Sequence, residues 1–281
     1  MTRIAIVTDI HHGAPSHTKR GDKALELLTA FTDWANAERP DLVLDLGDRI
    51  SDIDSQTDAR LEREVAEIFA RLDMPVHHIC GNHDRDHLSV AENEEILGAK
   101  LDNELIDLGE WQLALWRADA RIHREHPGPG FYLPETDLLW LSRVAQQAEK
   151  PMLVASHVPM SGHSQIGNYY FQRNAAASTY PQADRARAAL TQSRVPTACI
   201  AGHVHWNTVT TVDGIPHITQ QSLTESFTTG GEPARSWGML TLSDTVHWQV
   251  FGDEPFEARL TPSTMRWTPP LAPFLQEFAA E

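Results

Sequence analysis

The N-terminal third of the chain alternates short apolar runs with amphipathic stretches. The runs Ile4–Val7, Leu42–Leu46 and Val76–Cys80 are short and largely apolar, which predicts buried strands. Between them, apolar residues recur at helical spacing, first between residues 22 and 40 and then between residues 61 and 75. Strand, helix, strand, helix, strand with short connections is typical of βαβ units on a parallel sheet.

The same patterns predict the order of elements in the rest of the chain. We expect helix Val90–Leu97, strands Glu104–Leu108 and Gln112–Trp116, a helix over residues 138–148, strand Met152–Ala155, a helix over Pro181–Gln192 and strand Thr197–Ala201. Strands Thr208–Val212, Ile215–Thr219, Gly238–Leu242 and Val246–Phe251 should follow. Pro127-Gly128-Pro129-Gly130 predicts a break. Without repeats or a clear linker, we expect one domain, 1–281, in which 252–281 is a proline-containing surface tail ending in a short helix.

Composition narrows the classes of partner. The chain has 281 residues, enough for a core without stabilising disulfides or metals. It carries 39 Asp and Glu against 23 Lys and Arg, a formal charge of −16. This charge repels polyanions at long range, so no nucleic-acid polymer is expected as a partner. Small anionic substrates are still compatible with this net charge, because bound metal ions can make the electrostatic field positive at a binding site.

Cysteine usage and hydropathy predict the compartment. Cys80 and Cys199 each lie inside an apolar run without a neighbouring cysteine, which predicts reduced, buried thiols and no thiolate zinc site. No stretch approaches the ~20 apolar residues of a membrane span. The N-terminus indicates a first strand, not a signal peptide. We therefore expect a cytoplasmic protein; a homo-oligomer is left open.

Metal-capable side chains follow five of the predicted strands, at the edge where open α/β sheets build their sites. They are Asp9, His11, Asp48, Asn82, His83, His157, His203 and His205. All are oxygen or imidazole donors, a mix that suits Mn, Fe, Zn or Co. Their number exceeds what one tetrahedral ion needs and matches two divalent ions, which a carboxylate such as Asp48 could bridge.

The spacing of these donors is compatible with a shared site. In an extended segment, residues i and i+2 point the same way, so Asp9 with His11, and His203 with His205, would face one side if extension persists past each strand. Glycines 47, 81 and 202 precede donor-bearing residues, where the backbone needs to turn sharply or approach closely.

The ordered motifs resemble one known family. Asp-x-His at 9–11, Gly-Asp at 47–48, Gly-Asn-His-Asp at 81–84, the lone His157 before Val-Pro, and Gly-His-Val-His at 202–205 are similar to those of calcineurin-like metallophosphoesterases, over about residues 3–220. The resemblance implies an α/β fold, a four-layer α/β/β/α sandwich of two mixed β-sheets flanked by helices. It also implies two ligand sets: Asp9, His11, Asp48 and His205 for one ion, and Asp48, Asn82, His157 and His203 for the other.

The resemblance further implies catalytic roles. His83 would face the phosphate and its leaving group, and Asp84 would orient His83. The reaction would be hydrolysis of a phosphate ester of a small molecule or a nucleotide, with a phosphodiesterase favoured over a phosphomonoesterase using the same centre. A non-catalytic scaffold is disfavoured because His83 and every ligand are present. A DNA nuclease is disfavoured by the acidic charge.

Substrate contacts are predicted less directly. The loop over residues 161–179 is long and matches no motif of the family, which makes it a candidate for substrate selection. Its side chains Tyr169, Tyr170 and Arg173 are candidate substrate contacts. Outside the loop, His12 and Trp206 are further candidates, because each directly follows a predicted metal ligand.

Overall fold

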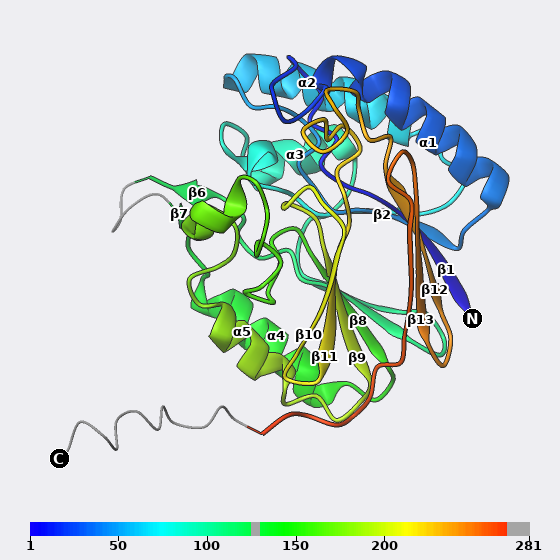
Figure 1. Ribbon diagram of the computed structural model, residues 1–281, viewed down its shortest axis with the longest axis vertical. Helices are drawn as coiled ribbons and strands as arrows, with labels where there is room; N and C mark the ends of the chain where they lie inside the picture. Colours follow the sequence, from blue (N-terminus) through cyan, green and yellow to red (C-terminus); the bar gives the residue numbers. More distant parts are fainter. Residues whose placement is uncertain (125–129, 269–281) are drawn as a thin grey trace.

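Two six-stranded sheets form the centre of the protein, and helices cover their outer faces. The computed structural model describes residues 1–124 and 130–268. Figure 1 shows α1 (Ala24–Glu38) and α2 (Ser55–Phe69) on one side of the sheets and α4 (Glu135–Gln147) and α5 (Ala183–Leu190) on the other. The predicted four-layer α/β/β/α architecture is confirmed.

The first sheet has the order β14-β13-β12-β1-β2-β3. Its strands are β1 (Thr2–Val7), β2 (Leu42–Asp45), β3 (Val76–His78), β12 (Trp237–Leu242), β13 (Val246–Phe251) and β14 (Phe256–Leu260). β1, β2 and β3 are parallel, as the βαβ pattern predicts, whereas β12, β13 and β14 add antiparallel neighbours. The sheet is therefore mixed, and the carboxyl ends of its parallel strands meet at one edge.

The second sheet has the order β10-β11-β9-β8-β5-β4. Its strands are β4 (Glu104–Asp107), β5 (Gln112–Leu115), β8 (Met152–Ser156), β9 (Thr197–Ala201), β10 (Thr208–Val212) and β11 (Ile215–Thr219). β5, β8, β9 and β11 run parallel, and an antiparallel strand closes each side. The carboxyl ends of β8 and β9 therefore also share one edge.

Three apolar layers hold this arrangement together, as β1 illustrates. Ile4 and Ile6 point between the sheets, where they join residues such as Leu113 and Ile200 of the second sheet. Ala5 and Val7 point outward into the layer under α1 and α2, and a third layer lies under α4 and α5. Alternate side chains of a strand face opposite sides of the sheet, so a continuous apolar run is buried on both faces.

The structure differs from the predicted elements mainly in the tail and in short additions. Residues 256–260 form the edge strand β14, because they continue the antiparallel hairpin from β13, so the tail is only partly irregular. β6 (Ile122–His123) and β7 (Gly130–Phe131) form a small hairpin that the sequence patterns did not predict. Most of the predicted Pro-Gly break and the predicted final helix lie outside the described residues.

The remaining helical segments are short. α3 (Val90–Leu97) matches its predicted bounds. The 3₁₀ turns are η1 (Gly21–Lys23), η2 (His83–Arg85), η3 (Phe171–Arg173) and η4 (Ala175–Ala177). In residues 1–124 and 130–268, no helix combines the length and apolar character needed to cross a membrane.

Candidate functional site

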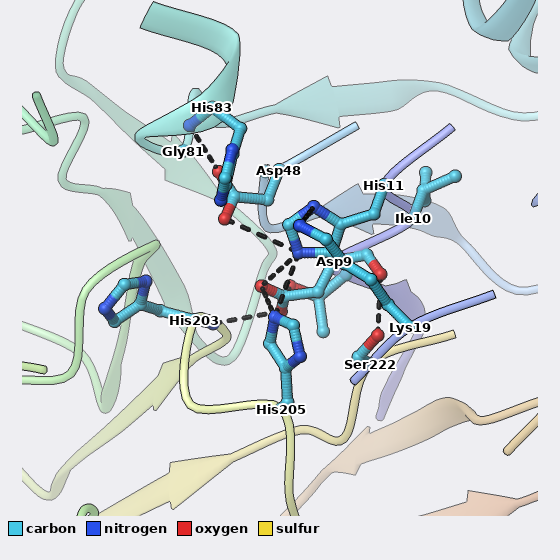
Figure 2. A network of polar contacts seen from close by, with 12 residues as sticks. Asp9, Ile10, His11, Lys19, Asp48, Gly81, His83, His203, His205 and Ser222 are labelled. Atoms are coloured by element: carbon cyan, nitrogen blue, oxygen red, sulfur yellow. Dashed lines mark hydrogen bonds and ion pairs between the residues drawn. The ribbon is translucent and has the colours of Figure 1, made fainter. Parts of the chain in front are cut away.

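The loops after β1, β2, β3, β8 and β9 bring all the predicted metal-capable residues to one edge of the molecule. Figure 2 shows side chains from four of these five loops around a common centre. Six predicted ligands are buried and His205 is partly buried; the buried ones are Asp9, His11, Asp48, Asn82, His157 and His203. Polar side chains are rarely buried together unless they are paired or bind a ligand.

The first group of donors comprises Asp9, His11 and His205, whose ligand atoms lie within 4.8 Å of one another. His11 Nε2 is 2.9 Å from His205 Nε2, and His205 Nε2 is 3.5 Å from Asp9 Oδ1. Asp9 Oδ1 is buried without a hydrogen-bond partner. Two ring nitrogens and a carboxylate oxygen therefore face one point, as they would to bind a cation.

The second group comprises Asp48, His157 and His203, also with ligand atoms within 4.8 Å of one another. His157 Nε2 is 3.4 Å from Asp48 Oδ2 and 3.3 Å from Asn82 Oδ1, which brings the amide into the same group. Asp48 Oδ2 is also 3.8 Å from His11 Nε2 of the first group. Asp48 thus lies between the two groups, where a bridging carboxylate is required.

Whether these residues fit metal ions can be judged from the outer nitrogen of each histidine, which is the ring nitrogen that faces away from the proposed ion. A histidine that binds a metal through one nitrogen donates the N–H of the other to a carboxylate or carbonyl oxygen. His157 Nδ1 lies 2.8 Å from the carbonyl oxygen of Leu46, and His205 Nδ1 lies 3.1 Å from Glu225 Oε2. His203 Nε2 lies 2.7 Å from the carbonyl oxygen of Ala177, which leaves its Nδ1 buried and unpartnered. The donor set fits two divalent ions.

Five of the donors have a left-handed backbone. The φ angles of Asp9, His11, Asp48, His203 and His205 are 51°, 51°, 56°, 69° and 63°. Such values are strained for residues other than glycine and persist only where the surroundings enforce them. Here Asp9 N donates to the carbonyl of Gly47, and His203 N donates to Asp9 Oδ2. The expectation that extension would orient these side chains is therefore wrong, because tight turns point them at the centre.

Two glycines let backbone segments approach the donors closely. A Cβ at Gly81 would lie 2.1 Å from Asp48 Oδ1 and 2.6 Å from His157 Cε1. A Cβ at Gly202 would lie 2.0 Å from Thr8 Oγ1 and 2.7 Å from Asp9 Oδ2. Both contacts are shorter than any real side chain tolerates, so the predicted need for glycine before these donors is explained by close approach.

Burial and neighbouring charges set the protonation of the site. Burial opposes ionisation of Asp48, but the adjacent His157 and His83 outweigh it and hold the pKa of Asp48 well below its ordinary value. At Asp9 burial dominates and raises the pKa. Burial, with the charge of His157, lowers the pKa of His203 to about 3. His203 is therefore a neutral imidazole at neutral pH, the form that binds metals.

His83 lies on the wall of the site, but Asp84 does not orient it. His83 Nδ1 is hydrogen bonded to Asp52 Oδ1, from the loop after β2. The oxygens of Asp84 instead accept from the backbone N–H groups of Asp48, Arg49 and Gly81, at 2.8 to 2.9 Å. The prediction that Asp84 supports His83 is thus corrected: Asp84 is buried under the turns and holds the backbone of Asp48 in place.

Asp84 belongs to a buried network in which Arg49 contacts three carboxyl groups. The Arg49 guanidinium donates to Asp45 Oδ2 at 2.8 Å and pairs with Glu62 at 2.5 Å, while one of its nitrogens lies 3.3 Å from Asp84 Oδ2. All four side chains are fully buried. The network ties Arg49, in the loop after β2, to β2, α2 and η2. Sequence reasoning missed Arg49 and Glu62, since no motif marks them.

A cavity of about 270 Å³ opens onto the two donor groups. Asp48, Asn82, His83, His203 and His205 line its polar end. Its other walls come from the loop before η1 (His17, Thr18 and Lys19), the β6–β7 hairpin (Ile122) and the loop after β8 (Tyr169, Tyr170, Phe171 and Ala177). The long loop that sequence reasoning singled out therefore reaches the site.

The other candidate substrate contacts lie elsewhere. His12 Nε2 pairs with Glu64 Oε2 of α2 at 2.6 Å, so its ring is engaged away from the cavity. The side chain of Arg173 is exposed and does not line the cavity. Trp206 Nε1 donates to the carbonyl of Ser164 at 2.9 Å, so the indole braces the long loop. The structure thus places neither His12, Arg173 nor Trp206 on the cavity wall.

Glu225 connects the aromatic wall to the first donor group. Its carboxylate accepts from Tyr169 Oη at 3.1 Å and lies 3.1 Å from His205 Nδ1. The Tyr169 ring stacks on Phe227 with centroids 3.7 Å apart. This contact fixes both Tyr169 and His205. Sequence reasoning did not find Glu225, which lies after β11 in a stretch without a recognisable motif.

Comparisons with known proteins agree with this geometry. No curated protein sequence matches the chain significantly. A dimetal phosphatase from Danio rerio has a similar structure, with a TM-score of 0.71 at 16% identity, covering 93% of this chain and 99% of that one. GAP50, the anchor in the inner membrane complex of Plasmodium, has a TM-score of 0.56 at 14% identity, with coverages of 99% and 94%.

A third similar structure is TT1561 of Thermus thermophilus, with a TM-score of 0.51 at 12% identity, covering 85% of this chain and 93% of that one. At these identities the neighbours establish the fold alone. The sequence carries the family relationship, because the model of one family matches residues 2–207, which contain every candidate metal ligand. The chain therefore belongs to the calcineurin-like phosphoesterase family.

Proposed function

We propose that the protein is a metal-dependent hydrolase of small phosphate esters and that phosphodiesters are its preferred substrates. Membership of the calcineurin-like phosphoesterase family supports phosphoester hydrolysis. The observation that carries the proposal is the position of Asp48 between two groups of buried donors, beside a cavity walled by His83. Two adjacent cation sites can stabilise the attacking and leaving oxygens of an in-line displacement at phosphorus, and a neighbouring histidine can supply a proton.

The ligand sets we propose follow the two groups. Asp9, His11, Asp48 and His205 would hold one divalent ion, and Asp48, Asn82, His157 and His203 the other. Mn, Fe, Zn and Co all accept this mixture of oxygen and imidazole donors. Such ions would supply positive charge for the phosphoryl oxygens and lower the pKa of a water molecule.

The catalytic role of the protein's own side chains centres on His83. Asp52 holds the ring at Nδ1, so Nε2 is the nitrogen that remains free to act. We propose that Nε2–H donates its proton to the departing alkoxide, with the pairing to Asp52 stabilising the charged ring until transfer. Asp84 contributes indirectly, because it fixes the backbone of Asp48.

A diester is favoured by the character of the cavity. A phosphomonoester carries a charge of roughly −1.5 to −2 near neutral pH, whereas a diester keeps one ionised oxygen. Lys19 is the one lysine or arginine among the residues that line the described cavity. Ile122, Phe171 and Ala177 add apolar surface to the lining, and Tyr169 and Tyr170 add aromatic rings. Walls of this kind suit a substrate with organic groups and little charge.

Tyr169 and Tyr170 are the substrate contacts we propose on the long loop. Both line the cavity, and Tyr170 is 48% exposed, a large fraction for an aromatic residue beside a buried site. Asn168 fixes the loop, since its Nδ2 donates to the carbonyl of Val204 and its Oδ1 accepts from Tyr170 N. The wall is therefore preformed.

A panel of esters tests the proposal. Protein stripped of metal is reconstituted with Mn, Fe, Zn or Co and assayed with bis(4-nitrophenyl) phosphate and 4-nitrophenyl phosphate. We expect hydrolysis that depends on the metal, with a higher kcat/KM for the diester. A higher kcat/KM for the monoester would make the protein a phosphomonoesterase instead. Bound metal without hydrolysis of either ester would indicate a binding scaffold and contradict the proposal.

A further inference from the structure

Lys19 places a cation against the metal-ligand cluster, although no motif marks it. It lies in the loop between β1 and η1 and lines the cavity together with His83 and Tyr170. Its Nζ is 2.9 Å from His11 Nδ1, and Figure 2 shows it pointing at that ring. Within the described part of the chain, its ammonium has no carboxylate in salt-bridge range, unlike Lys23 four residues later, which pairs with Glu26 at 3.7 Å.

The backbone around Lys19 is fixed on both sides. Arg20 N donates to the carbonyl of Thr224 at 2.9 Å, and Ser226 N donates to the carbonyl of Thr18 at 3.0 Å. These bonds make an antiparallel bridge between Lys19 and Glu225. A Cβ at Gly21 would lie 2.4 Å from the carbonyl oxygen of His11, so the loop returns in tight contact with the metal motif. The backbone that carries Lys19 is therefore fixed next to the site.

His11 differs from the other ligand histidines in the group that its outer ring nitrogen faces. The outer nitrogens of His157, His203 and His205 each face an oxygen acceptor, as ligand histidines require. The outer nitrogen of His11 faces an ammonium. A histidine that binds metal through Nε2 carries its proton on Nδ1, and an ammonium has only donors. Two donors cannot bond, so a metal-loaded His11 leaves Lys19 without an acceptor.

The protein offers no other free acceptor among the nearby described carboxylates. The acids whose charges act on Lys19 are Asp9, Asp48, Asp52 and Glu225. Asp52 holds His83, and Glu225 holds Tyr169 and His205. Asp9 and Asp48 are the proposed metal ligands. Lys19 is partly buried and opens onto the cavity, so an anion bound there can supply the partner that its ammonium lacks.

We propose that Lys19 is a substrate-binding catalytic residue whose ammonium binds a non-bridging oxygen of the phosphoryl group. The inference rests on the proposed function and deepens it, because it assigns the third contact of the phosphoryl group, beside the two cation sites. A lysine acts as a point charge toward phosphate and needs no bidentate geometry. The contact strengthens as charge develops on the oxygens, so it assists both binding and turnover.

The test compares Lys19→Met, Lys19→Arg and the control Lys23→Met. Inorganic phosphate is titrated into metal-loaded protein by calorimetry, metal content is measured per chain, and kcat/KM is measured with bis(4-nitrophenyl) phosphate. Lys19→Met should keep its metals, weaken phosphate binding by about 10- to 100-fold and lower kcat/KM similarly, the loss expected for one charged hydrogen bond. Lys19→Arg should recover part of both, and Lys23→Met should match the unmodified protein.

Two results would overturn the proposal. The first is unchanged phosphate affinity in metal-loaded Lys19→Met, and the second is loss of metal from this variant, which would make Lys19 a support for His11. Lys19→Gln gives a second neutral side chain if the methionine variant does not fold. The phosphate titration separates this proposal from the proposed function, because it reports on Lys19 even if no ester in the panel is hydrolysed.

Discussion

The imidazole of His83 is held by Asp52, which lies in another loop, and not by the adjacent Asp84. Asp52 reaches His83 from the loop between β2 and α2, four residues after Asp48 with its left-handed φ. Partial burial opposes ionisation of Asp52, but its bond to His83 outweighs this and lowers its pKa to about 2. Asp52 therefore stays ionised at neutral pH and can stabilise a protonated His83.

Replacing either member of this pair should impair turnover and spare the metals. His83→Ala is expected to lower kcat by about 100-fold or more, the usual contribution of a general acid, and Asp52→Asn by a smaller factor. Metal content per chain and steady-state kinetics measure both effects. Asp52→Asn should also move the basic limb of the pH–rate profile to lower pH, because the charged ring loses its counter-charge. Full turnover without His83 would contradict its role.

Asp84→Asn is the contrasting variant. Its carboxylate bonds the backbone of Asp48, Arg49 and Gly81, so its loss should loosen the turn that carries the bridging ligand. We expect weaker metal binding and a pH–rate profile of unchanged shape once metal is saturating. A shift of the profile like that of Asp52→Asn would place Asp84 in the catalytic pair after all.

The parts of the site that sequence could predict are those encoded locally. Apolar runs define β1, β2 and β8, and the donors that directly follow a run must lie at its carboxyl end. Asp52 and Glu225 could not be predicted, because each reaches the site through a turn whose path depends on the whole fold. Adjacency in sequence was misleading for Asp84: it follows His83 directly, but its carboxylate binds backbone N–H groups and not the His83 ring.

Most of the fold was also predictable from local sequence patterns. The elements that were missed are those without such a pattern. Continuous apolar runs located most of the strands, because burial on both faces of a sheet leaves such a run, and helical spacing of apolar residues located most of the helices. The edge strand β14 was missed because Phe256 and Glu257 are exposed, so its pattern shows little burial. The left-handed turns at Asp9 and His203 were missed because only a few per cent of residues other than glycine adopt such angles, so an Asp or His in the sequence does not predict one.

Asp48→Asn should weaken metal binding at both sites at once. Asp48 Oδ2 is 3.8 Å from His11 Nε2 and 3.4 Å from His157 Nε2, so one charge serves both donor groups. Equilibrium dialysis followed by elemental analysis should give fewer than two ions per chain for the variant. Asp33→Asn, on the exposed face of α1, is the control. Loss of one ion with the other bound at full affinity would rule out a bridging role.

Gly81→Ala tests close approach without changing any donor. The added methyl would lie 2.1 Å from Asp48 Oδ1 and 2.5 Å from Asp48 N. Because both atoms belong to the packed centre, the variant should lose metal affinity and about 1–3 kcal/mol of unfolding free energy. Gly98→Ala is the control for metal content alone: its φ of 63° strains an alanine, but its Cβ meets nothing within 4 Å, so the metal content should be unchanged. Full metal content in Gly81→Ala would contradict the packing argument.

Glu62 should make stability depend on pH. Burial raises its pKa from 4.5 to about 8, against the attraction of Arg49, and its Oε2 is buried without a partner. Between these values the folded protein holds a proton that the unfolded chain has lost, so the free energy of unfolding falls as pH rises. Relative to Glu62→Gln, which cannot titrate, the fall is about 1.4 kcal/mol per pH unit between roughly pH 5.5 and 7.5.

Urea unfolding of both proteins across this pH range measures the difference. Glu67→Gln, on the exposed face of the same helix, is the control and should follow the unmodified protein. If the difference between the unmodified protein and Glu62→Gln stays constant with pH, Glu62 is ionised throughout, and Arg49 then stabilises three carboxylates at once.

Tyr170→Ala tests the aromatic wall. Tyr170 is 48% exposed at the cavity and forms an edge contact with Phe171, centroids 4.9 Å apart, so its ring offers a fixed flat face. Stacking of a ligand ring on such a face contributes about 1–3 kcal/mol. The inhibition constant of phenylphosphonate should therefore rise by roughly 5- to 150-fold in the variant.

Methylphosphonate separates stacking from damage to the metal centre. It presents the same anionic head without a ring, so its inhibition constant should be the same for Tyr170→Ala and the unmodified protein. Tyr132→Ala removes another exposed tyrosine, 54% exposed and outside the cavity lining, and should change neither constant. Equal weakening of both phosphonates in Tyr170→Ala would mean that the ring positions the phosphoryl site, whereas no weakening of either would remove Tyr170 from the substrate contacts.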